Sequence, residues 1–316
     1  MKLFDLHCDT PYELSATGQS LYDNDLHISL KKASKYENYG QIAAVWSSKK
    51  LGDEEAYKKF WDISDNFFKE LSKNDRSAML CKSGEDIKKA WSEQKSAFVL
   101  SVEDARLLCD DISRLDLLFE RGVRVLTLLW GDETIIGGSH NTTAGLTDFG
   151  KQVTRRCFEI GIIPDVSHAS ERSADDVAEI SAECGRPFIA SHSCAYSVYD
   201  HTRNLRDHHI DVIKSTGGII GQSLCPSHLQ NGGAGIEAVV RHIEYYLSAG
   251  AGDNLALGGD LDGTSLPSGM NDLRDMDKLI DLLQRDGVSN DEIEKIFWRN
   301  AYDFAVKNIG RPAGAK

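Results

Sequence analysis

The chain has 316 residues, of which 41% are hydrophobic and 27% are charged. This composition is ordinary for a globular protein with a substantial core, and it argues against disorder and against a membrane-spanning protein. The formal net charge of −13 would repel polyanions, and no dense stripe of lysine and arginine offsets it, so we do not expect nucleic acid as a partner. The length fits one α/β barrel, and we expect a single domain over residues 1–316.

The start of the chain indicates where the protein works. Residues 1–5 turn acidic before any apolar segment develops, and no apolar run approaches the length of a membrane span. Seven cysteines form an odd set without a Cys-x-x-Cys pair, which is typical of reduced thiols. We therefore expect a cytoplasmic protein.

Short apolar segments alternate with amphipathic ones along the chain, as a parallel α/β fold requires. The eight expected strands are residues 2–7, 41–46, 96–102, 123–129, 161–165, 187–190, 218–222 and 255–260. Expected helices between them include residues 54–71, 84–91, 110–120, 148–159 and 173–183. This alternation favours a closed (β/α)8 TIM-type barrel.

A doubly wound open sheet is the competing fold. It would normally carry a glycine-rich phosphate turn after the first strand, where this chain has His7-Cys8-Asp9. Two long segments rich in small and polar residues, 131–147 and 263–271, are expected to form the rim or lid of a pocket.

Histidines and acids recur where the expected strands end, which is the face on which barrel enzymes assemble their active sites. These residues are His7, Asp9, Glu103, His168, His192 and Asp260. Taken singly, each has an ordinary structural explanation, such as a core histidine or a strand-end acid paired with a lysine or arginine. Three imidazoles and two carboxylates at four strand ends, with Asp260 at a fifth, favour a metal centre instead.

Imidazole with carboxylate suits Zn²⁺ first, with Mn²⁺, Co²⁺ and Fe²⁺ as alternatives. Two metals that share a carboxylate can acidify a bridging water and polarise a carbonyl, and they need an acid/base to move the proton. Asp260, within Gly258-Gly259-Asp260-Leu261-Asp262-Gly263, is placed for that role.

Six motifs then identify a family. Over essentially its whole length the chain resembles the membrane (renal) dipeptidase family of zinc peptidases, which have an amidohydrolase-like barrel. The resemblance rests on DLHCDT (5–10), VE (102–103), GLT with FG (145–150), DVSHAS (165–170), SHSCAYS (191–197) followed by Arg203-Asn204, and GGDLDG (258–263). Because the signal peptide and anchor of animal relatives are not visible, the sequence resembles a soluble bacterial-type member.

The resemblance implies a role for each motif residue. His7 and Asp9 would bind one zinc ion, His168 and His192 a second, and Glu103 would bridge both and take part in catalysis. Asp260 would shuttle the proton. Arg203 would hold the terminal carboxylate of a dipeptide, whereas its structural alternative is a surface arginine paired with Asp200 or Asp207.

One position departs from the animal-type pattern. Those relatives have a histidine after the fourth strand that contacts the tetrahedral intermediate, and this chain has Trp130 there. Its indole N–H can donate one hydrogen bond but cannot transfer a proton. His140, in the following loop, is a candidate substitute and equally a candidate for a solvated loop residue. We expect Trp130 and His140 to contact substrate.

The function that the resemblance implies is metal-dependent hydrolysis of short L,L or L,D dipeptides by a bridging water, with a side activity on β-lactam amides that family members share. Two alternatives stay open, namely an amidohydrolase acting on N-acyl amino acids or other small amides, and an inactive metal-binding homologue. Related deaminase-like or phosphotriesterase-like barrels usually begin with His-x-His. The resemblance also implies a homodimer. From charge and hydropathy we expect neither nucleic acid nor a membrane as a partner.

Overall fold

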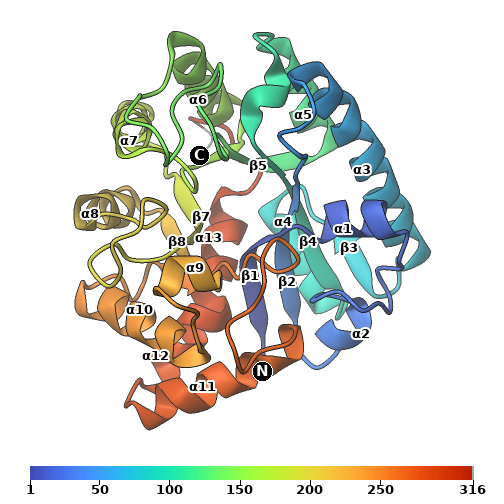
Figure 1. The fold of residues 1–316 in the computed structure, drawn as a ribbon. Coiled ribbons are helices and arrows are strands. Elements are labelled where there is room, and N and C mark those ends of the chain that lie inside the picture. The colour runs from blue at the N-terminus through green and yellow to red at the C-terminus, as the bar shows by residue number, and fades with distance from the viewer. Residues whose placement is uncertain (315–316) are drawn as a thin grey trace.

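Eight parallel strands close into a barrel in the computed structural model, which describes residues 1–314 (Figure 1). Around the barrel the order is β2-β1-β9-β8-β7-β6-β5-β4, and β4 pairs with β2 to close it. The barrel strands are β1 (Leu3–Cys8), β2 (Tyr39–Val45), β4 (Ser96–Glu103), β5 (Val123–Thr127), β6 (Ile163–Asp165), β7 (Ile189–Ser193), β8 (Ile219–Gln222) and β9 (Leu255–Leu257). The expected TIM-type barrel is therefore confirmed, and each of the eight expected strands overlaps one of these.

A ninth strand, β3 (Ala78–Leu80), was missed by the sequence analysis. It pairs with the start of β4, Ala78 opposite Ser96, whereas β5 pairs with β4 from Leu100 onwards. β3 therefore extends the sheet at the amino-terminal end of the barrel without entering its closure. Its three residues are too few to show a strand period in the sequence.

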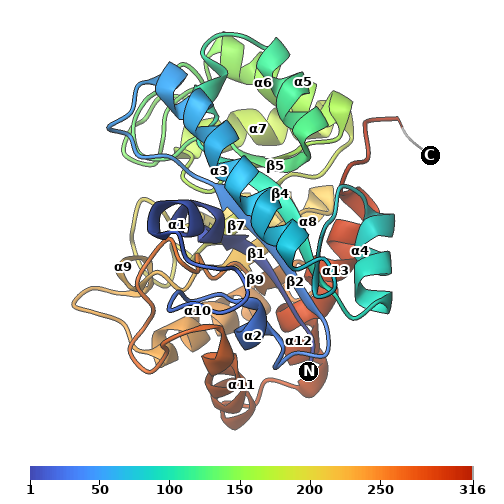
Figure 2. The ribbon, with the colours of Figure 1, turned by 90° about the vertical axis from the view of Figure 1, so that its right-hand side faces the viewer.

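Helices cover the outside of the barrel. The longer ones are α1 (Thr10–Thr17), α3 (Asp53–Lys73), α4 (Gly84–Ser92), α5 (Ser113–Arg121), α6 (Asp148–Ile160), α7 (Glu171–Cys184), α8 (Asp207–Thr216), α10 (Ile236–Ser248), α11 (Met276–Arg285) and α13 (Asn300–Asn308). Figure 2 shows α3 running along the outer side of the barrel. Its buried residues include Ala56, Phe60, Ile63, Phe67 and Leu71, a spacing that places them on one helical stripe.

Short elements complete the chain. They are α2 (Leu30–Ala33), α9 (Pro226–Leu229), α12 (Asn290–Glu294), the 3₁₀ turns η1 (Ala105–Leu108) and η2 (Leu273–Asp275), and the π-helical turn η3 (Lys295–Arg299). In the described part of the chain, no helix has both the length and the apolar character that crossing a membrane requires.

Two expected boundaries differ from the structure for local reasons. The helix expected over residues 110–120 begins at Ser113, because Cys109 and Asp110 have φ values of 52° and 59°, outside the helical region. The last strand ends at Leu257 rather than Asp260, whose φ is 54°. The chain therefore leaves the barrel before the Gly-Gly-Asp segment, which forms a loop over the strand ends.

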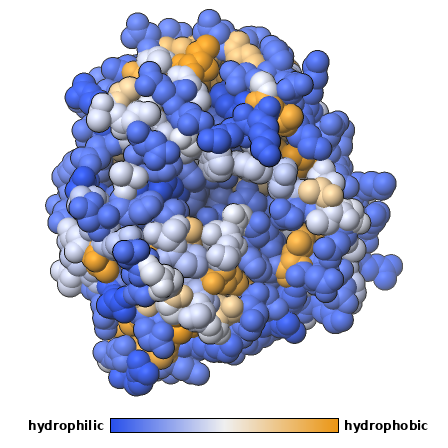
Figure 3. All heavy atoms as spheres, in the orientation of Figure 1, coloured by the Kyte–Doolittle hydropathy of each residue, from blue (hydrophilic) through white to orange (hydrophobic). Residues whose placement is uncertain are grey.

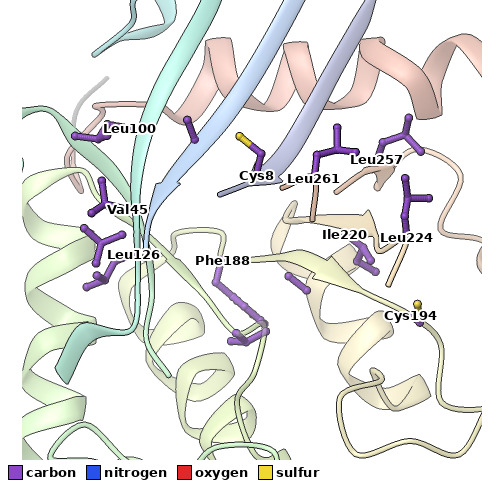
Figure 4. Packing of buried hydrophobic residues seen from close by; sticks show 14 of the residues in the cluster. Cys8, Val45, Leu100, Leu126, Phe188, Cys194, Ile220, Leu224, Leu257 and Leu261 are labelled. Atoms are coloured by element: carbon purple, nitrogen blue, oxygen red, sulfur yellow. The ribbon is translucent and has the colours of Figure 1, made fainter. Parts of the chain in front are cut away.

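The apolar core lies in two clusters. One joins buried side chains from all eight barrel strands to α4 and α13, including Phe4, Ile42, Val99, Val125, Ile163, Ile189, Ile219 and Ala256. The second and larger cluster packs the strands against the other helices. Figure 4 shows part of it, in which Cys8 lies near Leu261 and Leu257.

The contact between α4 and α13 gives a test of this packing. A Cβ at Gly84 would lie 2.0 Å from the carbonyl oxygen of Val306 in α13, so Gly84→Ala must push the two helices apart. We expect a loss of about 1–3 kcal/mol in the free energy of unfolding, measured by denaturant titration. Gly131→Ala is the control, since nothing lies within 4 Å of its added Cβ. Equal stability of the two variants would contradict the α4–α13 contact.

Candidate metal centre and active site

The six residues singled out at the strand ends meet at the carboxyl-terminal end of the barrel. They come from distant segments: His7 near the end of β1, Asp9 at the start of α1, Glu103 at the end of β4, His168 after β6, His192 in β7 and Asp260 after β9. All except His168 and Asp260 are buried, and those two are half-buried. Parallel strands bring their ends together in this way, so residues far apart in sequence share one site.

The carboxylate of Glu103 lies at the middle of the group. Its Oε1 is 3.0 Å from His168 Nε2 and 3.5 Å from His192 Nε2. Its Oε2 is 3.7 Å from His7 Nε2. The two oxygens of one side chain therefore face two different sets of imidazoles.

The protonation of His168 and His192 follows from their outer hydrogen bonds. His168 Nδ1 lies 2.9 Å from the carbonyl oxygen of Trp130, which can only accept, so Nδ1 carries the proton. Ser191 Oγ donates to Asp165 at 2.5 Å, so it accepts from His192 Nδ1 at 2.8 Å. Both Nε2 atoms then present lone pairs to each other at 2.9 Å. This contact cannot be a hydrogen bond, and a shared cation would satisfy both atoms.

His7, Asp9 and Asp260 form the other half of the group. His7 Nε2 is 3.6 Å from Asp9 Oδ2 and 4.0 Å from Asp260 Oδ1, and neither His7 Nε2 nor Asp9 Oδ1 has a hydrogen-bond partner among the described residues. Donors held at about 2.0–2.2 Å from one tetrahedral ion lie about 3.3–3.6 Å apart. The spacing is too wide for hydrogen bonds and close to that of metal ligands.

The acidic side chains of Asp9, Glu103 and Asp260 bring more negative charge to the site than His7 can balance. Burial is the largest influence on the pKa of Asp9 and, with the charge of Glu103, raises it to about 6. Burial also raises the pKa of Asp260 well above its usual value, opposed by His7 and supported by Asp9. For His7, burial lowers the pKa, but Glu103 and Asp9 together outweigh it and leave the pKa well above normal. The acids therefore favour a bound cation.

Burial, followed by nearby cations, lowers the pKa of both His168 and His192 well below the usual value. These two imidazoles are therefore neutral, the form in which histidine binds a metal.

Two buried aspartates that the sequence analysis did not single out hold this geometry. Asp165 Oδ1 accepts the backbone N–H groups of Ser167 and Ser191 at 2.9 and 2.8 Å, and its Oδ2 accepts from Thr127 and Ser191 Oγ. Asp5 accepts from His7 N at 2.9 Å and from Gly259 N at 2.8 Å. The available sequence signal was an acid among apolar strand residues, inside β1 for Asp5 and at the end of β6 for Asp165.

The backbone is unusual at the same place. His168 and Asp260 have φ values of 71° and 54°, in the left-handed region that non-glycine residues rarely adopt. A Cβ at Gly263 would lie 2.1 Å from Asp9 Oδ2 and 2.3 Å from Asp260 Oδ1. Only glycine therefore leaves room there for the two carboxylates.

Arg203 is buried beside this group without a carboxylate partner. Its guanidinium makes no ion pair with Asp200, Asp207 or any other described acid, and its Nε has no hydrogen-bond partner. Within the described residues, the guanidinium donates one hydrogen bond, of 3.5 Å, to the carbonyl oxygen of His192. The surface ion pair considered from the sequence is absent from the described residues. A buried, unpaired guanidinium is costly unless an anion binds to it.

His140 lies next to the site rather than in solvent. Its backbone N–H donates to the His168 carbonyl at 2.8 Å, and the two rings are 5.8 Å apart. Burial, then the charge of Arg203, lowers the pKa of His140 to about 4, so the ring is neutral. His201 and His228, which the sequence analysis did not single out, flank Arg203 and have pKa values lowered by burial and by the Arg203 charge.

A cavity of about 200 Å³ opens over the group. Its lining is Asp9, Tyr12, Glu13, Trp46, Glu103, Trp130, His168, Asp260, Asp262 and Gly263. Figure 3 shows that the face seen in Figure 1 is hollowed near its middle, with mainly hydrophilic residues around the hollow. Of the two expected rim segments, 263–271 reaches the lining through Gly263, whereas the lining contains no residue of 131–147, only Trp130 directly before it. Tyr12, Glu13 and Trp46 were not found from the sequence, because nothing distinguishes them from ordinary surface residues.

The curated proteins with similar sequences include a protein that is named a dipeptidase. The chain is 32% identical over 237 residues to dipeptidase tcpJ of Claviceps purpurea, which covers 72% of this chain and 54% of that protein. It is 29% identical over 234 residues to an uncharacterised protein in the pqqA 5′ region of Klebsiella pneumoniae, covering 70% of this chain and 85% of that one.

Solved structures share the whole fold. One is the dipeptidase AC, a metallo peptidase of family M19, with a TM-score of 0.90, 22% identity and coverage of 98% of this chain and 99% of that one. Another is a metallo peptidase of Rhodobacter sphaeroides liganded with a phosphinate mimic of L-Ala-D-Ala, with a TM-score of 0.89, 22% identity and the same coverage. At this identity the likeness establishes the fold alone.

The sequence profile of one family covers nearly the whole chain. Residues 1–304 match the membrane dipeptidase family, which is peptidase family M19. The strand-end donors and the barrel agree with that match. The chain therefore belongs to the membrane dipeptidase family (peptidase family M19), a family of metal-dependent dipeptidases.

Proposed function

We propose that the chain, acting as one hydrolase domain, cleaves the peptide bond of short L,L or L,D dipeptides with two bound Zn²⁺ ions. The observation that carries the choice of a dipeptide is the buried, unpaired guanidinium of Arg203 beside the group of metal-type donors. A small substrate with a free carboxylate would supply the missing anion. The dipeptide mimic bound by the Rhodobacter sphaeroides relative supports the same substrate class.

The donor set divides into two proposed sites that share Glu103. His7 and Asp9 would hold one ion with Glu103 Oε2, and His168 and His192 would hold the other with Glu103 Oε1. The support is the orientation of the two carboxylate oxygens and the facing lone pairs of His168 and His192. Imidazole and carboxylate ligands suit Zn²⁺, and Mn²⁺, Co²⁺ or Fe²⁺ would also be accepted.

Bound metal ions would polarise the scissile carbonyl and acidify water. Asp260 then takes a proton from the attacking water at Oδ1 and passes it to the amine of the departing residue. Burial raises the pKa of Asp260, so its carboxylate is a stronger base than that of an exposed aspartate, as a proton acceptor requires. One water is added across the C–N bond, and two free amino acids leave.

Arg203 would orient the substrate through a bidentate contact to its carboxylate. Neutral His140, adjacent to His168, and the indole N–H of Trp130 are the proposed hydrogen-bond donors to substrate oxygens. The contact to His168 comes from the backbone carbonyl of Trp130 and not from its side chain, so tryptophan in place of histidine there would leave this proposed metal ligand oriented.

All seven cysteines are free thiols, five of them buried, which supports a reducing compartment such as the cytoplasm.

The substrate class is tested with Ala-Ala in its L,L and L,D forms beside N-acetyl-L-alanine and N-acetyl-D-alanine. Each compound offers a carboxylate to Arg203, but only the dipeptides carry a free amine. We expect release of alanine from the dipeptides after chelated protein is reloaded with Zn²⁺. If only the N-acetyl compounds are cleaved, the protein is an N-acyl amidohydrolase instead of a dipeptidase. If the protein binds metal but cleaves none of the four compounds, it is the inactive metal-binding homologue.

Replacement of Asp260, the proposed proton shuttle, should lower the turnover number kcat. For Asp260→Asn we expect kcat on the preferred dipeptide to fall by about 10²–10⁴-fold, because the amide cannot accept the proton. Steady-state kinetics and metal analysis of the same preparation provide the measurement. Full activity in a variant that retains its metal would rule out Asp260 as the shuttle.

The outer hydrogen bonds can be tested through metal affinity. Asp165→Asn removes the carboxylate that accepts from Ser191 and so loosens His192, and we expect metal affinity to drop by about 10–100-fold. Competition with a chelator of known affinity measures it. The matched control is Asp62→Asn on α3, where the aspartate is exposed. If both variants retain parental affinity, Asp165 has no part in holding the site.

The effect of metal on stability should increase with pH. In the metal-free protein the pKa of Asp9 is raised from 3.8 to about 6, so its contribution to stability is present below pH 4 and is lost as the pH rises through about 6. His7, with a raised pKa, loses its contribution at still higher pH. A metal ion that binds takes the place of the protons on Asp9 and His7. We expect the rise in Tm on adding Zn²⁺ to grow between pH 5 and pH 7.5, and to vary less with pH in Asp9→Asn. A rise in Tm independent of pH in the parent would contradict this.

A further inference from the structure

One acid in the cavity wall lies outside the proposed set of metal ligands and has no positively charged partner among the described residues. Glu13, on α1, lines the cavity and is half-buried. Its carboxylate takes part in no ion pair or side-chain hydrogen bond within residues 1–314. The neighbouring acid Asp262 differs, because its oxygens accept from Thr10 Oγ1 at 2.6 Å and from His27 N at 2.5 Å. Glu13 is therefore free to bind a cation that the substrate brings.

Aromatic side chains form the wall beside Glu13. The rings of Tyr12 and Trp46 are 4.9 Å apart, and those of Trp46 and Trp130 are 5.3 Å apart, so the three form a continuous row in the cavity lining. Such a row packs against an aliphatic stem and also attracts a positive charge. Apolar rings that end at an unpaired carboxylate match the shape of a lysine or arginine side chain.

The position of Glu13 distinguishes a side-chain cation from the α-ammonium group. The N–H of Glu13 donates to the carbonyl of Asp9 at 3.2 Å, so Glu13 lies four residues beyond that proposed metal ligand, slightly more than one helical turn and about 6 Å along the axis. The α-ammonium nitrogen of a dipeptide lies only about 2.5 Å from the scissile carbonyl carbon. It must therefore remain close to Asp9 and Asp260, whereas a cation on a long side chain can extend to Glu13.

We propose that Glu13, with Tyr12, Trp46 and Trp130, forms a subsite for a cationic side chain on the amino-terminal residue of the dipeptide, which makes Lys-X and Arg-X dipeptides the preferred substrates. This inference rests on the proposed dipeptidase function. The burial of Glu13 and the nearby charges of Asp262 and Asp9 raise its pKa, as expected for an acid that lacks a cationic partner. The opposite charge, on Arg203, serves the carboxylate end of the substrate.

The experiment compares kcat/KM for L-Lys-L-Ala with that for L-norleucyl-L-Ala, which keeps the four-carbon stem and lacks the ammonium group. We expect the lysyl dipeptide to be preferred by about 10- to 100-fold, the range for a hydrogen bond to a charged partner. In Glu13→Gln the ratio should fall towards one. In Glu13→Lys it should fall below one, and L-Glu-L-Ala should then be cleaved faster than L-Lys-L-Ala.

Glu179→Gln is the matched control, because Glu179 is exposed on α7, away from the cavity lining. It should keep the ratio of the parent protein. Cleavage of both dipeptides with equal kcat/KM by the parent would overturn the subsite and leave the dipeptidase standing. A ratio that survives in both Glu13 variants would assign the preference elsewhere and also overturn it. Failure to cleave either dipeptide, with Ala-Ala also inert, would overturn the proposed function and this inference together.

Discussion

The carboxylates of Asp9, Glu103 and Asp260 converge at the end of the barrel with too little positive charge from the protein to balance them. Burial makes ionised acids expensive, and the neutral imidazoles of His168 and His192 add two facing lone pairs rather than protons. Divalent cations would both neutralise the buried carboxylates and accept the two facing lone pairs. The geometry of the site follows from that requirement, and so do the pH dependence and the chemistry proposed for it.

Buried hydrogen bonds to two aspartates hold the segments that carry these donors in position. Asp165 ties the segment after β6 to Ser191 within β7, and Asp5 ties His7 within β1 to the segment after β9, so parts of four strands are held by two carboxylates. The apolar cluster within the strands holds the barrel itself. The proposed function then depends on loops above a rigid frame, from which Trp130, His140 and Arg203 would contact the substrate.

Much of this was accessible from the sequence. Eight strands and the six strand-end residues were recognisable because polar groups that follow apolar runs mark the end of a barrel strand, and the family resemblance gave Arg203 its role. Contacts across the barrel were not accessible. The dependence of His192 on Asp165 through Ser191 joins residues on different strands, and Glu13 and Trp46 reach the cavity only through the placement of α1 and the end of β2. Tertiary geometry, not local pattern, decides such contacts.

The most direct test of the account is a metal titration of the chelated protein, with dipeptide hydrolysis and bound metal measured in the same samples. A centre in which Glu103 joins two ions predicts that activity reaches its plateau at two equivalents of Zn²⁺ per chain. It also predicts that Glu103→Gln loses both tight metal binding and turnover. Full hydrolysis by metal-free protein, or an activity plateau at one equivalent that Glu103→Gln retains, would contradict it.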